Sequence, residues 1–153
     1  VVAVAESKET KPKMEEALAA GTTVVLDRFG SASMLHQAAK QSDPGDRAAT
    51  MRWIYHLEHE VFAAPMPDEL IYLDVPAATR IELMQQQWVE EGRHADVAEM
   101  NEGHQTRVDA IAEELLAIYP HHYRLNGMRD GQLRTREDIH EEIYEHVRGI
   151  LEG

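Results

Sequence analysis

Two apolar segments separated by helical stretches constrain the fold of this chain most strongly. Residues 22–26, with the sequence Thr-Thr-Val-Val-Leu, are β-branched and apolar without alternation, which is typical of a strand buried on both faces. Residues 70–75, with the sequence Leu-Ile-Tyr-Leu-Asp-Val, predict a second strand that also ends beside a carboxylate. Strands that are connected through helices need crossover connections and therefore pair in parallel. The sequence thus predicts an α/β fold in three layers, with a parallel sheet flanked by helices.

Helix signals surround these two segments. Apolar periodicity and turn residues predict helices over residues 8–19, 32–41, 46–62, 76–89, 99–119 and 135–150. Gly21 stands where a left-handed helix stop is expected, and Asp46 and Thr135 are the expected N-caps. Met51, Ile54, Leu57 and Val61 have the spacing of a core-facing stripe. Residues 121–126 are predicted to form a short third strand.

Length and charge exclude several classes of protein. The chain has 153 residues, which is enough for one domain, residues 1–153, around one core. Lys and Arg number 15 against 28 Asp and Glu, so the net charge of −13 opposes binding to a long nucleic acid. No apolar stretch approaches the ~20 residues of a membrane-spanning helix. Cysteine is absent, which fits a cytoplasmic protein and excludes disulfides and thiol chemistry.

Charged residues follow both predicted strands. Asp27 and Arg28 end the first strand and Asp74 ends the second. Ligands of open parallel sheets bind beyond the carboxyl ends of the strands. There, a carboxylate can hold hydrated magnesium and a guanidinium can bind a phosphate. The alternative is that Asp27 caps the next helix and Arg28 pairs with a surface acid.

The residues after the first strand extend this pattern. Asp27 to Ala38 has the sequence Asp-Arg-Phe-Gly-Ser-Ala-Ser-Met-Leu-His-Gln-Ala, and it follows a helix, Gly21 and an apolar strand. The run resembles thymidylate kinase, whose members carry Asp-Arg-Tyr, then a Ser and a Tyr-Gln or His-Gln pair at these offsets. Pro67 to Pro76 is similar to the family's Pro-Asp strand, and the resemblance extends through Thr135 to Val147. It therefore covers nearly the whole chain.

The resemblance implies a P-loop kinase-like fold and transfer of the γ-phosphoryl group of ATP to dTMP with magnesium. Carried over by position, Arg28 would clamp the acceptor phosphate and Asp27 would organise magnesium and water. The acceptor pocket would be lined by Phe29, Ser33, His36 and Gln37, with Gln37 approaching the thymine. A lid-like segment around residues 90–100 would contribute Arg93 as a cation over the transferring group, together with Asp96 and Glu99.

The chain departs from the family at its beginning. Members start with a strand and a glycine-rich loop that binds the ATP phosphates, and no G-x-x-x-x-G-K-[ST] sequence occurs here. The resemblance places that strand at the sheet centre, where its absence would leave backbone groups unpaired. We expect about 50–70 further N-terminal residues, or a second chain that supplies the strand. Without either, the chain should bind acceptor poorly and catalyse nothing.

Other features leave alternatives open. Ser7 aligns with an acceptor-binding Arg of the family, for which Lys8 or Lys11 could substitute. His36 stands where Tyr is common, and Leu35 and Ala38 replace smaller residues, so the preferred nucleobase stays open.

Two further questions concern metal binding and assembly. His56 and His59 lie one turn apart, but no metalloprotease-like spacing is present and no metal site is expected. A homodimer through helices is one expected assembly. The alternative to an enzyme is a degenerate kinase-fold protein that serves as a structural or interaction subunit.

Overall fold

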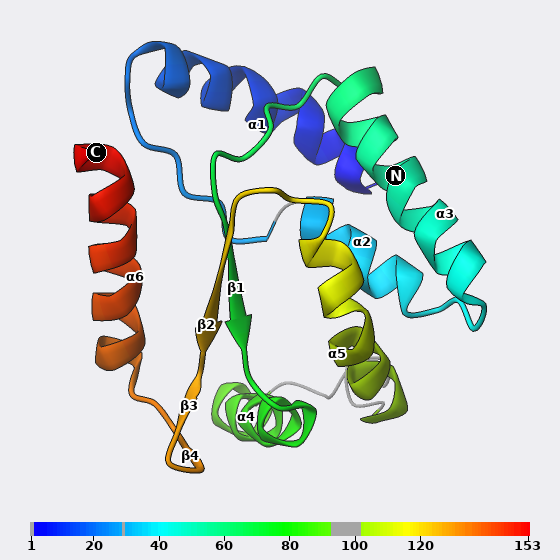
Figure 1. Cartoon of the computed structure of the whole chain (residues 1–153), viewed down its shortest axis with the longest axis vertical. Coiled ribbons are helices and arrows are strands. Elements are labelled where there is room, and N and C mark those ends of the chain that lie inside the picture. Colours follow the sequence, from blue (N-terminus) through cyan, green and yellow to red (C-terminus); the bar gives the residue numbers. More distant parts are fainter. Residues whose placement is uncertain (1, 29, 93–101) are drawn as a thin grey trace. The chain divides into compact units, whose positions relative to one another are not determined.

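The computed structural model describes residues 2–28, 30–92 and 102–153, and it has an α/β fold (Figure 1). The helices are α1 (Val2–Ala19), α2 (Gly30–Ala38), α3 (Pro44–Tyr55), the π-helix η1 (His56–Val61), α4 (Ala77–Glu91), α5 (Glu102–Leu116) and α6 (Arg136–Glu152). The strands are β1 (Leu70–Asp74), β2 (His122–Asn126), β3 (Met128–Arg129) and β4 (Gln132–Leu133). The chain divides into two compact units, Val1–Asp68 with Ile111–Ile118 and Glu69–Ala110 with Tyr119–Gly153.

The first unit begins with α1 and its predicted stop. Gly21 adopts a left-handed backbone with φ of 75°. The Gly21 N–H donates to the Leu18 carbonyl, and the Thr22 N–H donates to the Ala17 carbonyl, each over 2.9 Å. These two bonds form a Schellman motif, which satisfies carbonyls at the helix end. The core of this unit consists of Met14, Met34, Leu35, Ala38, Ala39, Met51, Ile54, Ile111, Ala112, Leu115 and Leu116.

The predicted strand at residues 22–26 does not form. These residues are irregular in the structure, and they are mostly exposed instead of buried. Val25 is 85% exposed and Leu26 is 40% exposed. A strand is stable only when a neighbouring strand satisfies its backbone groups, and no strand among the described residues pairs with this segment. The prediction of a strand buried on both faces is therefore wrong for this structure.

The third helix begins three residues earlier than predicted. Asp43, not Asp46, is the N-cap, and its Oδ1 accepts from the N–H groups of Gly45 at 2.7 Å and Asp46 at 3.1 Å. Pro44 takes the first helical position, where its missing N–H costs nothing. The prediction also treated residues 46–62 as one regular helix, whereas η1 replaces its last part. The wider π-turn breaks the 3–4 spacing, so Val61 of the predicted stripe is 57% exposed.

Ala63 follows η1 with a positive φ of 48°, a conformation that strains an L-residue. The turn is fixed, because the Ala64 N–H donates to the Glu58 carbonyl over 2.9 Å. We expect Ala63→Gly to raise the free energy of unfolding by about 1 kcal/mol. As a control, Ala49→Gly in the regular helix α3 should lower it by about 1 kcal/mol. Urea denaturation checks both values, and a loss of stability in Ala63→Gly would contradict the prediction.

The second unit contains the parallel pair β1–β2, which confirms the predicted strands at residues 70–75 and 121–126. Leu70 is opposite His122, and Asp74 is opposite Asn126. Val75, Val108, Tyr119 and Leu125 form the buried apolar core of this unit.

A close backbone contact and a capped helix complete the second unit. A Cβ added at Gly127 would lie 2.5 Å from Val75 Cγ2, so glycine permits the chain between β2 and the β3–β4 hairpin to pack closely on Val75. Thr135 caps α6 as predicted, because its side chain accepts from the Asp138 N–H over 3.1 Å. Figure 1 shows α6 after the hairpin, at the C-terminal end of the chain.

Candidate functional site

Asp27 and Arg28 lie in an exposed turn between α1 and α2. They do not end a strand, because residues 22–26 form none, and this part of the prediction is wrong. Arg28 has a φ of 64°, so the turn holds a non-glycine residue in the left-handed region. Neither side chain has a hydrogen bond or ion pair with another described residue. The guanidinium is thus available to a ligand, and the alternative in which Arg28 pairs with a surface acid is not observed among these residues.

Helix α2 carries the other predicted acceptor residues. Ser33, His36 and Gln37 are spaced three and four residues apart, so they share one side of the helix. Met34, Leu35 and Ala38 are buried and anchor the other side in the core. Ser33 and His36 are partly buried and Gln37 is exposed, where its Oε1 accepts from Lys40 Nζ at 3.0 Å. The helix therefore fixes a polar row of a hydroxyl, an imidazole and an amide.

Glu58 is a residue of this region that the sequence did not indicate. It lies in η1, and a Cβ added at Gly30 would lie 1.4 Å from Glu58 Oε2. The carboxyl group therefore packs on the backbone at the start of α2. Oε2 is buried and has no hydrogen-bond partner in the described structure. Burial raises the pKa of Glu58, and the neighbouring His59 partly opposes this shift.

Lys11 and two histidines of the first unit have structural partners, whereas the side chains of Ser7 and Lys8 lie outside the described part of the structure. Lys11 Nζ donates to the Phe62 carbonyl at 2.8 Å, which places this lysine at the end of η1. His56 Nδ1 lies 2.8 Å from Glu60 Oε2, and His59 Nδ1 lies 3.0 Å from the Ala64 carbonyl oxygen. No group of three potential metal ligands occurs within the described residues.

Asp74 belongs to the second unit, at the carboxyl end of β1. Its Oδ2 accepts from Arg124 Nε at 3.0 Å and Arg124 Nη2 at 2.8 Å. Both of these N–H donors of the guanidinium bond this one oxygen, and the ion pair links β1 to β2. Phe29, Arg93, Asp96 and Glu99 lie outside the described residues, and so does most of the lid-like segment predicted around residues 90–100.

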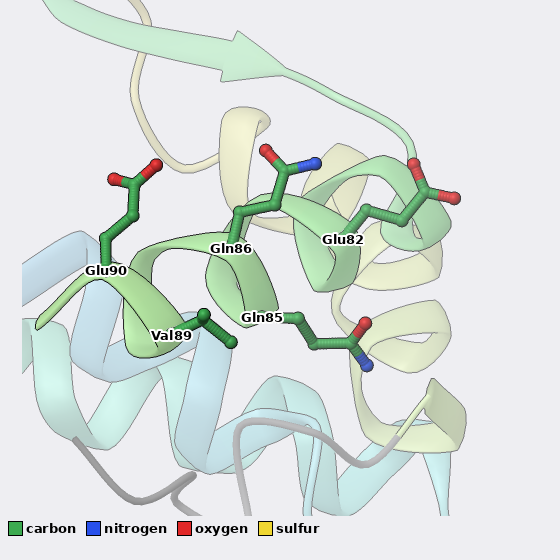
Figure 2. Close-up of a pocket in the computed structure, with 5 residues that line it drawn as sticks. All are labelled: Glu82, Gln85, Gln86, Val89 and Glu90. Carbon is green, nitrogen blue, oxygen red and sulfur yellow. The ribbon is translucent and has the colours of Figure 1, made fainter. Parts of the chain in front are cut away.

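One surface hollow of the second unit lies along α4. It is lined by Glu82, Gln85, Gln86, Val89 and Glu90, all from that helix (Figure 2). The lining offers carboxylates and amides but no cationic side chain, and Figure 2 shows how these side chains project from α4. A nucleotide phosphate needs cations or clustered N–H donors. The chemistry of this hollow therefore does not match a phosphate site, and the candidate site remains the Asp27–Gln37 segment.

The donor set of that segment fits an acceptor phosphate better than it fits ATP. Arg28 offers five N–H donors in a planar fork, and the exposed Asp27 offers a carboxylate for one position around a hydrated magnesium ion. The phosphate chain of ATP needs a cradle of backbone N–H groups with a lysine. The 153 residues contain no such loop, so they do not fit the ATP phosphates.

Comparison with known protein families matches most of the chain. The family model described as thymidylate kinase matches residues 1–144, which include the Asp27–Gln37 segment, both strands of the parallel pair and the start of α6. No solved structure matches the chain.

Proposed function

The chain belongs to the thymidylate kinase family, and from this membership we propose that its protein transfers the γ-phosphoryl group of ATP to dTMP, giving ADP and dTDP. The observation that carries the proposal is the turn that exposes Arg28 directly before the polar side of α2. A guanidinium next to a row of hydrogen-bonding side chains can bind a phosphate and a base at opposite ends of one nucleotide.

The chain's own residues would act mainly by positioning. Arg28 binds the acceptor phosphate and holds an oxygen of it in line for attack. Ser33 and Phe29 line the pocket, and His36 and Gln37 contact the nucleobase. When bound, ATP and magnesium supply the phosphoryl group and neutralise its charge, with Asp27 holding the ion's water shell.

The lid-like segment would add positive charge near the transferring phosphoryl group. Phosphoryl transfer spreads negative charge over the oxygens of the transferring group, and cations nearby lower the barrier. Arg93 would place one such cation there, and Asp96 and Glu99 belong to the same segment.

A further strand would complete the sheet in a three-layer arrangement. The exposure of Val25 and Leu26 supports this, because an apolar β-branched segment without a neighbour is a pairing site. We propose that additional residues of the native protein, or a partner chain, supply the central strand and the ATP-phosphate loop. A homodimer through helices is a second assembly compatible with this proposal.

The proposed cellular location and partners follow from the net charge of the chain and the polarity of its helices. In the described part of the chain, no helix has the length and apolar character to cross a membrane. We propose that the protein works in the cytoplasm on small nucleotides, and that its net charge of −13 keeps it from long nucleic acids.

A coupled ADP-release assay tests the function. The native-length protein is expected to release ADP only when dTMP, ATP and magnesium are all present. Residues 1–153 alone are expected to release none, because they lack the ATP-phosphate loop. Intact mass of the native protein shows whether further residues are present. Absence of turnover in the native-length protein, with dTMP and dUMP both tried, would favour the structural subunit.

A further inference from the structure

The carboxyl group of Glu58 lies in an environment that is energetically unfavourable for it. Its Oε2 is buried without a hydrogen-bond partner among the described residues, and burial raises the pKa of the group. Leaving a buried polar atom unsatisfied destabilises a fold, and a leucine of similar size would avoid this penalty. Each such group in a native structure needs an explanation, and one explanation is a partner that arrives with a ligand.

The backbone at Gly30 holds this carboxyl group close to the acceptor segment. With a Cβ at Gly30 the nearest Glu58 oxygen would be 1.4 Å away, so only glycine leaves room for it. Glu58 reaches this position from η1, a π-helical turn of a type that often marks functional sites. Gly30 is two residues after Arg28, whose guanidinium is exposed and unpaired with any described residue.

The carboxyl group of Glu58 and the guanidinium of Arg28 are chemically complementary. A carboxylate uses two of the five N–H donors of a guanidinium and leaves the others free for a phosphate. We propose that Glu58 is a positioning residue that pairs with Arg28 when the acceptor binds, and that this pair orients the remaining N–H groups toward the acceptor phosphate. The inference rests on the proposed function, and it adds a residue outside the Asp27–Gln37 segment to the acceptor site.

A double-mutant cycle on the native-length protein tests the pairing. The affinity for dTMP is measured by calorimetry for the wild type, Arg28→Ala, Glu58→Leu and the double variant. We expect Glu58→Leu to weaken binding about tenfold in the wild type and to have no effect in the Arg28→Ala background. Glu58→Gln, which keeps the shape of the side chain and removes its charge, should weaken binding as well.

Thermal unfolding without nucleotide separates this role from packing. Glu58→Leu is expected to raise Tm by roughly 2–4 °C, because it removes an unsatisfied buried carboxyl group. Glu60→Leu is the matched control in the same turn, since Glu60 is exposed and pairs with His56. This control should leave the dTMP affinity unchanged.

The outcomes distinguish the two proposals. Equal effects of Glu58→Leu in the wild-type and Arg28→Ala backgrounds would overturn the pairing, and so would unchanged dTMP affinity in Glu58→Leu and Glu58→Gln. A wild-type protein that binds no dTMP would instead overturn the proposed function. Weaker binding together with a higher Tm in Glu58→Leu would support the pairing, because a packing role predicts the opposite change in Tm.

Discussion

Replacing Arg28 with alanine is expected to weaken dTMP binding by about 100-fold, because charged hydrogen bonds to the phosphate are each worth about 1.5–3 kcal/mol. Arg28 is exposed and has no other partner among the described residues, so the substitution removes no structural contact that they show. Arg28→Lys keeps the charge but loses the planar fork, and an intermediate affinity is expected. Calorimetry measures the dTMP affinity of the native-length wild type and of both variants.

A glycine variant separates the guanidinium from the backbone strain. The φ of 64° at Arg28 strains alanine as much as arginine, whereas glycine adopts it freely. Arg28→Gly should therefore be more stable than Arg28→Ala by about 1 kcal/mol and bind dTMP equally poorly. Wild-type affinity in Arg28→Gly would show that the turn conformation, and not the guanidinium, recognises the acceptor. That result would remove the main residue assignment of the proposed function.

Local signals in the sequence predicted the elements that local interactions stabilise. Gly21 ends α1 and Thr135 starts α6, and each forms its bonds within a few residues of the chain. The predicted strand at residues 22–26 failed for a different reason. Its apolar β-branched composition was correctly identified, but a strand depends on partners distant in sequence, and the described residues provide none for it.

The candidate site was predicted in part. The resemblance identified the Asp27–Gln37 segment, and the structure places Ser33, His36 and Gln37 along one helix. Glu58 was missed, because regular helix periodicity over residues 46–62 did not predict a π-turn that turns a glutamate toward Gly30. Gly30, two residues after Arg28, was the available signal, since glycine permits close approach of another group.

The largest loss of stability is expected from Arg134, which connects α6 to the end of β2. Its side chain is only 5% exposed. The guanidinium Nε lies 2.7 Å from Asp138 Oδ2 and Nη2 lies 2.6 Å from Glu142 Oε2, while Nη1 donates to the Asn126 carbonyl at 3.0 Å. Tyr123 on β2 also donates to Glu142, over 2.7 Å. Arg134→Met would remove the cation that Asp138 and Glu142 share and leave Asp138 with the exposed Arg129 alone, whose Nη1 lies 2.9 Å from Asp138 Oδ2, so a decrease in Tm at neutral pH is expected.

The same network predicts how stability depends on pH. The hydrogen bond from Arg134 lowers the pKa of Asp138, and hydrogen bonds from Tyr123 and then Arg134 lower the pKa of Glu142. Carboxylates with lowered pKa values stabilise the fold above the ordinary carboxyl range, and this contribution is lost as the pH falls through the lowered values. The difference in Tm between wild type and Arg134→Met should therefore be largest at neutral pH and shrink toward pH ~3.

Arg148 provides the matched control for this prediction. It lies on α6, is partly exposed and pairs with Glu145 on the same helix. Arg148→Met should change Tm little, because exposed pairs within a helix contribute weakly. Adding Glu142→Gln to Arg134→Met should recover part of the lost stability, since it removes one of the two repelling charges. Equal Tm values for Arg134→Met and Arg148→Met, measured by calorimetry from pH ~3 to ~8, would show that this network does not hold α6 to the sheet.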